Sequence, residues 1–190
     1  MRCFIAIDID EGIRKQIDRL QNELRQKTGL TKPDVKWTEP ALIHLTLKFL
    51  GEVRDADITK VCEIAAAVAA NHKGFWVDVA RVGSFGSAAR VLWVGIDRND
   101  ALLTLQKDLD EQLSAAGWGG DKKQFAGHLT LCRIKKPKAG RILKGFIKDY
   151  SDLSLGSFGV DSICVYKSEL TSSGPIYTVI STNSLKKPNN

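Results

Sequence analysis

The sequence has no hydrophobic run that could cross a membrane, because none approaches the roughly 18 apolar residues that a spanning helix needs. Its short apolar N-terminus reaches Asp8 too soon for a secretory signal peptide. The chain has only four cysteines, and no two of them form a C-x-x-C pair. A chain of this length does not need disulfide bonds for stability, so we expect a cytoplasmic protein with reduced thiols.

Acidic residues are missing from one long segment of an otherwise ordinary composition. Of the 190 residues, 43% are hydrophobic and 26% are charged, which fits one globular domain or two small lobes. The net charge is +6, yet residues 122–148 contain nine basic residues and no acidic ones. A polyanionic partner would explain this segment, and a solvated basic face is the alternative.

Histidine is scarce, and two of the three histidines begin the same tetrapeptide. The sequence HLTL occurs at residues 44–47 and again at residues 128–131. The apolar positions of residues 11–28 also match those of residues 100–116. Coincidence explains this agreement poorly, so we predict an internal duplication.

The duplication defines the expected domain organisation. We predict a single two-lobed domain over residues 1–185, with repeats at roughly 2–84 and 90–168, and a flexible tail at 186–190. Each repeat has the hydrophobic pattern of a strand, a helix, a strand, a helix and a strand. The predicted strands are 3–8, 42–50, 75–82, 90–97, 126–134, 158–167 and 176–182, and the predicted helices are 11–28, 55–71, 100–116 and 139–149.

Alternating strands and helices are also typical of a parallel doubly wound sheet. Duplicated β-α-β-α-β units with histidines on central strands fit two antiparallel-rich sheets better. We therefore predict an α+β fold that is bilobal and pseudo-two-fold symmetric, with its two sheets facing a central cleft.

The repeated motif places a histidine and a threonine on one face of each strand, because side chains alternate along a strand. His44 and Thr46 form one pair, and His128 and Thr130 form the other. Two facing imidazoles suit general acid–base catalysis, since one can accept a proton while the other donates one. The threonine hydroxyls can donate hydrogen bonds to an oxyanion, so the pattern suits a phosphate diester substrate.

Other interpretations of the histidines are weaker. A single partly buried histidine is usually structural, but the duplication favours a shared function. Two histidines without an Asp, Glu or Cys at ligand spacing make a poor metal site, so we expect no metal. No glycine-rich phosphate loop precedes a predicted helix, which argues against the use of a nucleoside triphosphate. His72 is most simply a residue at the C-terminal end of a helix.

With both motifs identified, the sequence resembles the two-histidine phosphoesterases, and within them the RNA 2′,3′-cyclic phosphodiesterases, also called 2′-5′ RNA ligases or LigT-like proteins. The resemblance covers nearly the whole chain. Gly127 departs from the family pattern, because proline usually precedes the second histidine, and glycine loosens the backbone entering the strand. The segments that carry the resemblance are 2–7, 44–52, 85–86, 90–95, 128–133 and 174–179.

The resemblance implies metal-independent hydrolysis of RNA or nucleotide 2′,3′-cyclic phosphates to 2′-phosphomonoesters, without a cofactor. It also implies that His44 is the proton donor to the departing O3′ and that His128 is the proton acceptor from water. The residues alone do not assign these roles, because the two motifs are locally identical. Several family members also join 2′-5′ linkages reversibly, with a 5′-hydroxyl in place of water. The resemblance implies neither a membrane nor an obligate protein partner.

Three further residues are candidates for substrate binding, namely Lys48, Arg133 and Tyr177. Strict alternation places Lys48 and Cys132 on the histidine face, where Lys48 could contact phosphate and Cys132 would be a small filler. Arg133 belongs to the second motif of the family, but alternation puts it on the opposite face unless the strand bulges.

Some alternatives stay open at this point. Phe49, Trp93 and Tyr177 could stack on a nucleobase, although aromatic residues on strands are more often part of the core. The enzyme could instead act on 2′-5′ oligonucleotides or oligouridine tails. The chain could also be an RNA-binding module with a vestigial site, which the two complete motifs disfavour.

Overall fold

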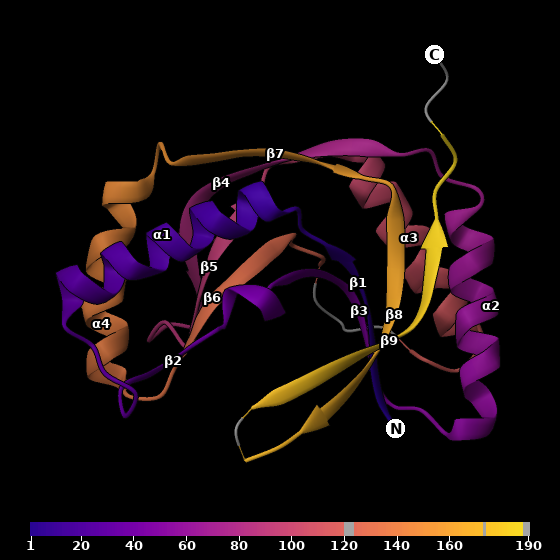
Figure 1. The fold of residues 1–190 in the computed structure, drawn as a ribbon, viewed down its shortest axis with the longest axis horizontal. Helices are drawn as coiled ribbons and strands as arrows, with labels where there is room; N and C mark the ends of the chain where they lie inside the picture. Colours follow the sequence, from indigo (N-terminus) through magenta and orange to yellow (C-terminus); the bar gives the residue numbers. More distant parts are fainter. Residues whose placement is uncertain (120–123, 173, 188–190) are drawn as a thin grey trace.

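The computed structural model describes residues 1–119, 124–172 and 174–187, whose strands form two antiparallel sheets (Figure 1). The first sheet has the strand order β3-β1-β8-β9, and the second has the order β2-β6-β5-β4-β7. The predicted α+β fold with antiparallel sheets is therefore confirmed. The strands are β1 (Arg2–Asp8), β2 (Val35–Trp37), β3 (His44–Glu52), β4 (Phe75–Phe85), β5 (Val91–Ile96), β6 (His128–Ile134), β7 (Ser154–Val160), β8 (Ser162–Leu170) and β9 (Pro175–Ser184). The helices are α1 (Glu11–Thr28), α2 (Ile58–Ala69), α3 (Asp100–Ala115) and α4 (Pro137–Phe146), with the 3-10 turns η1 (Pro40–Leu42), η2 (Asp55–Asp57) and η3 (Ile147–Tyr150).

The first helix of each repeat begins at a capping residue. The Asp10 side chain accepts a hydrogen bond from the backbone N–H of Ile13 at 2.7 Å, and that of Asn99 accepts one from Leu102 at 2.9 Å. Gly29 ends α1 in the left-handed conformation, with φ of 61°. The bounds that the sequence predicts for α1 are those observed.

The first helix of each predicted repeat lies with the sheet that carries the HLTL motif of the other repeat, whereas α2 and α4 do not cross. In Figure 1, α1 and α4 lie with the second sheet, and α2 and α3 lie with the first. Helix α1 belongs to the first repeat but contacts β7 of the second sheet, whereas α3 belongs to the second repeat but contacts β3 of the first sheet. The apolar core is continuous between the sheets, because Ile5 and Leu45 belong to the same buried cluster as Leu92 and Leu129.

Two strand predictions need correction. The single strand expected at 158–167 is two strands, β7 and β8, which Asp161 separates and which belong to different sheets. The edge strand β2 is absent from the prediction, because three residues are too few to show an alternating pattern.

Two predicted segments lie partly outside the described residues. These are the basic segment, of which Lys122 and Lys123 are not described, and the expected tail, of which residues 188–190 are not described. The backbone of Lys186 hydrogen-bonds the backbone of His72 and Gly74, so the first residue of that tail is held in place. No helix in the described ranges has both the length and the apolar composition needed to span a bilayer.

Candidate active site

The two strands that carry the HLTL motifs, β3 and β6, contact each other although they belong to different sheets. Residues directly opposite each other on neighbouring strands point the same way, so the register shows which side chains share a face. His44 and Thr46 lie opposite alternate residues of β1, and His128 and Thr130 lie opposite alternate residues of β5. Each motif therefore presents an imidazole and a hydroxyl on one face, which we call the histidine face.

Both imidazoles are held in the same way by the backbone two residues before them. The Nδ1 atom of His44 lies 2.9 Å from the carbonyl oxygen of Leu42, and that of His128 lies 2.8 Å from the carbonyl oxygen of Ala126. Because a carbonyl oxygen can only accept, Nδ1 carries the proton in each ring and donates it. Each neutral histidine therefore leaves its Nε2 atom available for proton transfer.

The pKa of each of the two histidines lies below the ordinary value of 6.5, chiefly because burial disfavours the charged ring. Nearby charges then distinguish the two rings. The Asp8 carboxylate raises the pKa of His44, whereas the Arg133 guanidinium lowers the pKa of His128. Repulsion from His128 also lowers the pKa of His44, so the two imidazoles lie near enough to sense each other's charge.

Aromatic rings account for much of this burial. Phe4 stacks on His44 with ring centroids 4.7 Å apart, and Tyr177 meets the same imidazole edge-on at 5.3 Å. On the other sheet, Phe85 meets His128 edge-on at 4.8 Å. These rings exclude water from one side of each imidazole, and desolvation of this kind destabilises the imidazolium form.

Two glycines allow close packing around His128. The centroid of the Trp93 ring lies 6.4 Å from that of the His128 ring. The same indole packs on Gly83, where a Cβ atom would come within 2.1 Å of it. At Gly127, a Cβ atom would lie 3.1 Å from the Cβ atom of Ile96. Glycine before the second histidine therefore suits the close approach of this segment to β5.

A β-bulge in β6 reverses the alternation of side chains after Thr130. The register of β6 against β5 skips Leu131, so Thr130 and Cys132 lie opposite consecutive residues of β5. Leu131 and Cys132 are both buried in the core, and Arg133 emerges on the histidine face. The prediction that Cys132 lies on the histidine face is wrong, and Arg133 reaches that face because the strand bulges.

A second bulge has the same effect in β3. The register of β3 against β1 skips Leu47, so Lys48 points to the opposite face from His44 and is only 6% exposed. Lys48 forms an ion pair with Asp110 of α3. The prediction that Lys48 lies on the histidine face is therefore wrong. Phe49 occupies that face instead and is 61% exposed.

Arg133 is close to both halves of the site. The charge of Arg133 lowers the pKa of His128. Burial raises the pKa of Tyr177, whose ring contacts His44, and the charge of Arg133 opposes that rise. Lys36 of β2 lies opposite Arg133 and is exposed, which places a second cation beside it. The sequence pattern does not single out Lys36, because its strand is too short to be predicted.

The remaining groups on the histidine face suit an anionic ligand. The hydroxyls of Thr46 and Thr130 make no side-chain hydrogen bond with any other described residue, so they are free to donate to a ligand. In the described part of the chain, no three His, Cys, Asp or Glu side chains gather as a metal site would require. Two imidazoles, two hydroxyls and one guanidinium can together bind a phosphate group and transfer protons to and from it.

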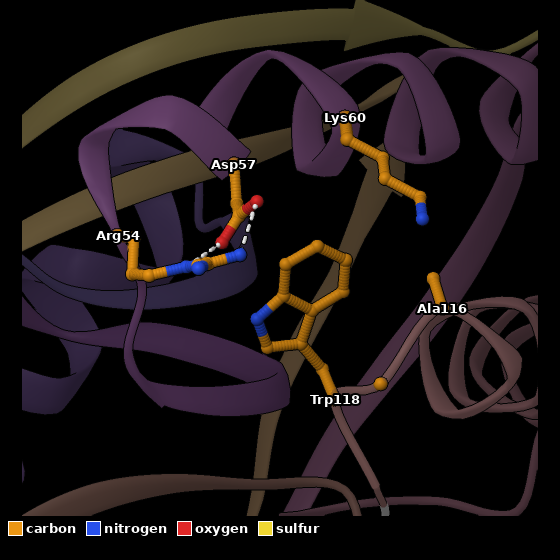
Figure 2. Close-up of a pocket in the computed structure, with 6 residues that line it drawn as sticks. Arg54, Asp57, Lys60, Ala116 and Trp118 are labelled. Atoms are coloured by element: carbon orange, nitrogen blue, oxygen red, sulfur yellow. Dashed lines mark hydrogen bonds and ion pairs between the residues drawn. The ribbon is translucent and has the colours of Figure 1, made fainter.

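A separate hollow of about 290 Å³ lies between the start of α2 and the end of α3 (Figure 2). Arg54 donates two hydrogen bonds to the Asp57 carboxylate, at 2.6 and 3.1 Å, and the Trp118 ring stands between this pair and Lys60 (Figure 2). The hollow has no imidazole for proton transfer near neutral pH. Its lining residues are Arg54, Asp57, Lys60, Ala116, Gly117 and Trp118.

Comparison with known proteins places these observations in a family. The model of the LigT-like phosphoesterase family matches residues 7–93 and, a second time, residues 94–177. The RNA 2′,3′-cyclic phosphodiesterase of Methanocaldococcus jannaschii is 33% identical over 182 residues, which cover 95% of this chain and 98% of the relative. That of Methanothermobacter thermautotrophicus is 30% identical over 180 residues, which cover 94% and 95%.

Solved structures share the fold. A protein of Thermus thermophilus superimposes with a TM-score of 0.81 at 24% identity, over 100% of both chains. Escherichia coli LigT complexed with 3′-AMP superimposes with a TM-score of 0.75 at 24% identity, over 97% of both chains.

Proposed function

Because the chain belongs to the LigT-like phosphoesterase family, we propose that it hydrolyses RNA or nucleotide 2′,3′-cyclic phosphates to 2′-phosphomonoesters. The shared name of its relatives, RNA 2′,3′-cyclic phosphodiesterase, supports this activity. The observation that carries the mechanism is the pair of imidazoles, each of which donates Nδ1–H to a backbone carbonyl and keeps Nε2 free.

The charges around the two rings support different roles for them. Asp8 favours the protonated form of His44, which suits a general acid, whereas Arg133 favours the neutral form of His128, which suits a general base. His128 Nε2 takes a proton from water, and the water oxygen attacks phosphorus. The bond from phosphorus to O3′ then breaks, and His44, which enters the reaction as the doubly protonated imidazolium, gives its Nε2 proton to O3′. The phosphate remains on O2′.

Other residues of the histidine face hold the phosphate group in this proposal. Thr46 and Thr130 donate hydrogen bonds to its non-bridging oxygens, and the Arg133 guanidinium balances the negative charge that grows on them in the transition state. Phe49 offers an exposed ring on which a nucleobase can stack, and Tyr177 closes the site beside His44.

The substrate class in this proposal is RNA with a 2′,3′-cyclic phosphate end, or the corresponding cyclic nucleotides. Lys36 beside Arg133, together with the exposed basic residues of α4, would attract the RNA backbone. The same geometry permits reversible 2′-5′ ligation, in which a 5′-hydroxyl replaces water as the nucleophile. Four free cysteines suit a reducing cytoplasm, where such RNA ends would be processed.

The regiochemistry of the product tests this proposal. Incubation with 2′,3′-cyclic AMP should give 2′-AMP alone, because in the proposed mechanism His44 protonates O3′. Chromatography separates 2′-AMP from 3′-AMP. Formation of 3′-AMP would contradict the proposed arrangement, and the absence of any hydrolysis would contradict the proposed activity.

A further inference from the structure

The carbonyl group of the bulged residue in β6 accepts two hydrogen bonds. The backbone N–H of Thr38 donates to the Leu131 oxygen at 2.9 Å, and Nε2 of Gln21 donates to the same oxygen at 2.9 Å. Gln21 Nε2 also donates to the carbonyl oxygen of Thr38 at 2.8 Å. Because both partners of the amide are carbonyl oxygens, its nitrogen must be the atom that faces them. Gln21 thus joins the bulge in β6 to the residue that follows β2.

The burial of Gln21 indicates a specific task. Its side chain is fully buried on the apolar face of α1, beside Ile17, Leu20 and Leu24. Glutamine is seldom buried, because a buried amide is costly unless it is hydrogen-bonded. An apolar residue would fill this position in the core as well, so packing alone does not account for the amide.

The bulge in β3 is held from the equivalent position of the second repeat. Asp110 of α3 corresponds to Gln21 of α1, and it pairs with Lys48 directly after the bulged residue Leu47. Gln106, one turn earlier on α3, donates to the carbonyl oxygen of Leu47 at 3.4 Å. The first helix of each repeat therefore contacts the bulge in the motif strand of the other repeat.

We propose that Gln21 is a positioning residue for phosphate recognition, because it fixes the bulge that turns Arg133 toward the histidines. The inference rests on the proposed function, in which Arg133 binds the phosphate group. Without the bulge, alternation would carry Arg133 to the core face and bring Cys132 to the histidine face. Through Gln21, the first repeat controls how the second repeat binds phosphate.

Calorimetric binding of adenosine 2′-monophosphate and of adenosine tests this role. Gln21→Met keeps the length of the side chain and removes both hydrogen-bond donations. A displaced Arg133 would lose about one hydrogen bond to the charged phosphate group. We therefore expect Gln21→Met to weaken binding of adenosine 2′-monophosphate about ten-fold and to leave adenosine binding unchanged. Equal weakening of both ligands would contradict a role in phosphate recognition.

A double-mutant cycle shows whether Gln21 acts through Arg133. In the Arg133→Ala background, Gln21→Met should change the affinity for adenosine 2′-monophosphate by less than about two-fold, because both changes remove the same contact. Losses that add fully would overturn the inference.

Two control variants separate positioning from general stability. Leu20→Ala weakens the packing of α1 but leaves both hydrogen bonds to the Leu131 carbonyl group in place, and Gln112→Met removes an amide that bonds Asp108 on α3. Both variants should bind adenosine 2′-monophosphate with the affinity of the wild-type protein. If Leu20→Ala weakens binding as much as Gln21→Met does, the inference is wrong.

A further variant covers the case in which Gln21→Met does not fold. Gln21→Asn keeps a buried amide but shortens it by one methylene, and it should weaken adenosine 2′-monophosphate binding without affecting adenosine. Unchanged affinity in a folded Gln21 variant contradicts the inference alone. If the wild-type protein neither binds adenosine 2′-monophosphate nor hydrolyses 2′,3′-cyclic AMP, the proposed function is contradicted instead.

Discussion

The ion pair between Lys48 and Asp110 gives a quantitative prediction, because its two partners are unequally buried. The Lys48 side chain is 6% exposed, and the Asp110 side chain is 36% exposed. Asp110→Asn would leave the Lys48 ammonium group buried without its counter-ion, a change that typically costs about 3–5 kcal/mol. Since solvent reaches a third of Asp110, we expect a smaller loss in the free energy of unfolding, about 2–3 kcal/mol.

Lys48→Met should behave differently, because it removes the charge that needs a partner. Replacing a buried ion-pair residue by an apolar one of similar volume is often neutral, so Lys48→Met should change the free energy of unfolding by less than about 1 kcal/mol. The double variant with Asp110→Asn should recover most of the stability that Asp110→Asn alone loses.

Thermal unfolding followed by circular dichroism measures both effects. For a chain of this length, a loss of about 2–3 kcal/mol lowers Tm by about 4–12 °C. Lys48→Met should also retain most of its hydrolysis of 2′,3′-cyclic AMP, because Lys48 lies on the opposite face from the histidines. A stable Lys48→Met variant that no longer binds phosphate would refute the register of β3 and return Lys48 to the substrate site.

The site also predicts how the protein responds to chelation, to pH and to salt. Hydrolysis should continue in EDTA, because two imidazoles supply the acid and the base; activity lost in EDTA and restored by one divalent ion would contradict this. The pH profile of kcat/KM should be bell-shaped and centred below pH 6.5, since burial lowers the pKa of both motif histidines. Asp8→Asn should move the alkaline limb to lower pH, because it removes the charge that raises the pKa of His44; an unmoved limb would reverse the assignment of acid and base. The affinity for single-stranded RNA should fall by about 0.7 log units per log of salt concentration for each neutralised phosphate. The double variant Lys138→Glu, Arg141→Glu should make this dependence less steep. An unchanged dependence would show that these two residues are a solvated surface and do not contact RNA.

The sequence predicts the parts of this site that depend on short-range patterns. The repeated HLTL tetrapeptide identifies both histidines and puts each on the face of its threonine, because one strand's alternation suffices for that inference. The bounds of α1 follow from Asp10 and Gly29, which act on the nearest turn of the helix.

The sequence does not predict features that depend on a partner strand. The bulges at Leu47 and Leu131 depend on contacts with neighbouring strands and helices, so strict alternation misplaces Lys48, Cys132 and Arg133. The division of the predicted strand 158–167 has the same cause, since β7 pairs with β4 whereas β8 pairs with β1 and β9. Local periodicity carries no information about which sheet a strand joins.

The most direct test of the central claim is the turnover of 2′,3′-cyclic AMP by His44→Ala, His128→Ala and the double variant. Each single variant should lose about 10²–10⁴-fold in rate, because a missing acid or base typically costs that much. The double variant should be little worse than either, since the two groups act as one unit. His72→Ala is the matched control and should keep full activity, because His72 follows α2 and pairs with Asp108 of α3, away from the motif strands. A folded His44→Ala variant with near-normal turnover would contradict the two-histidine mechanism.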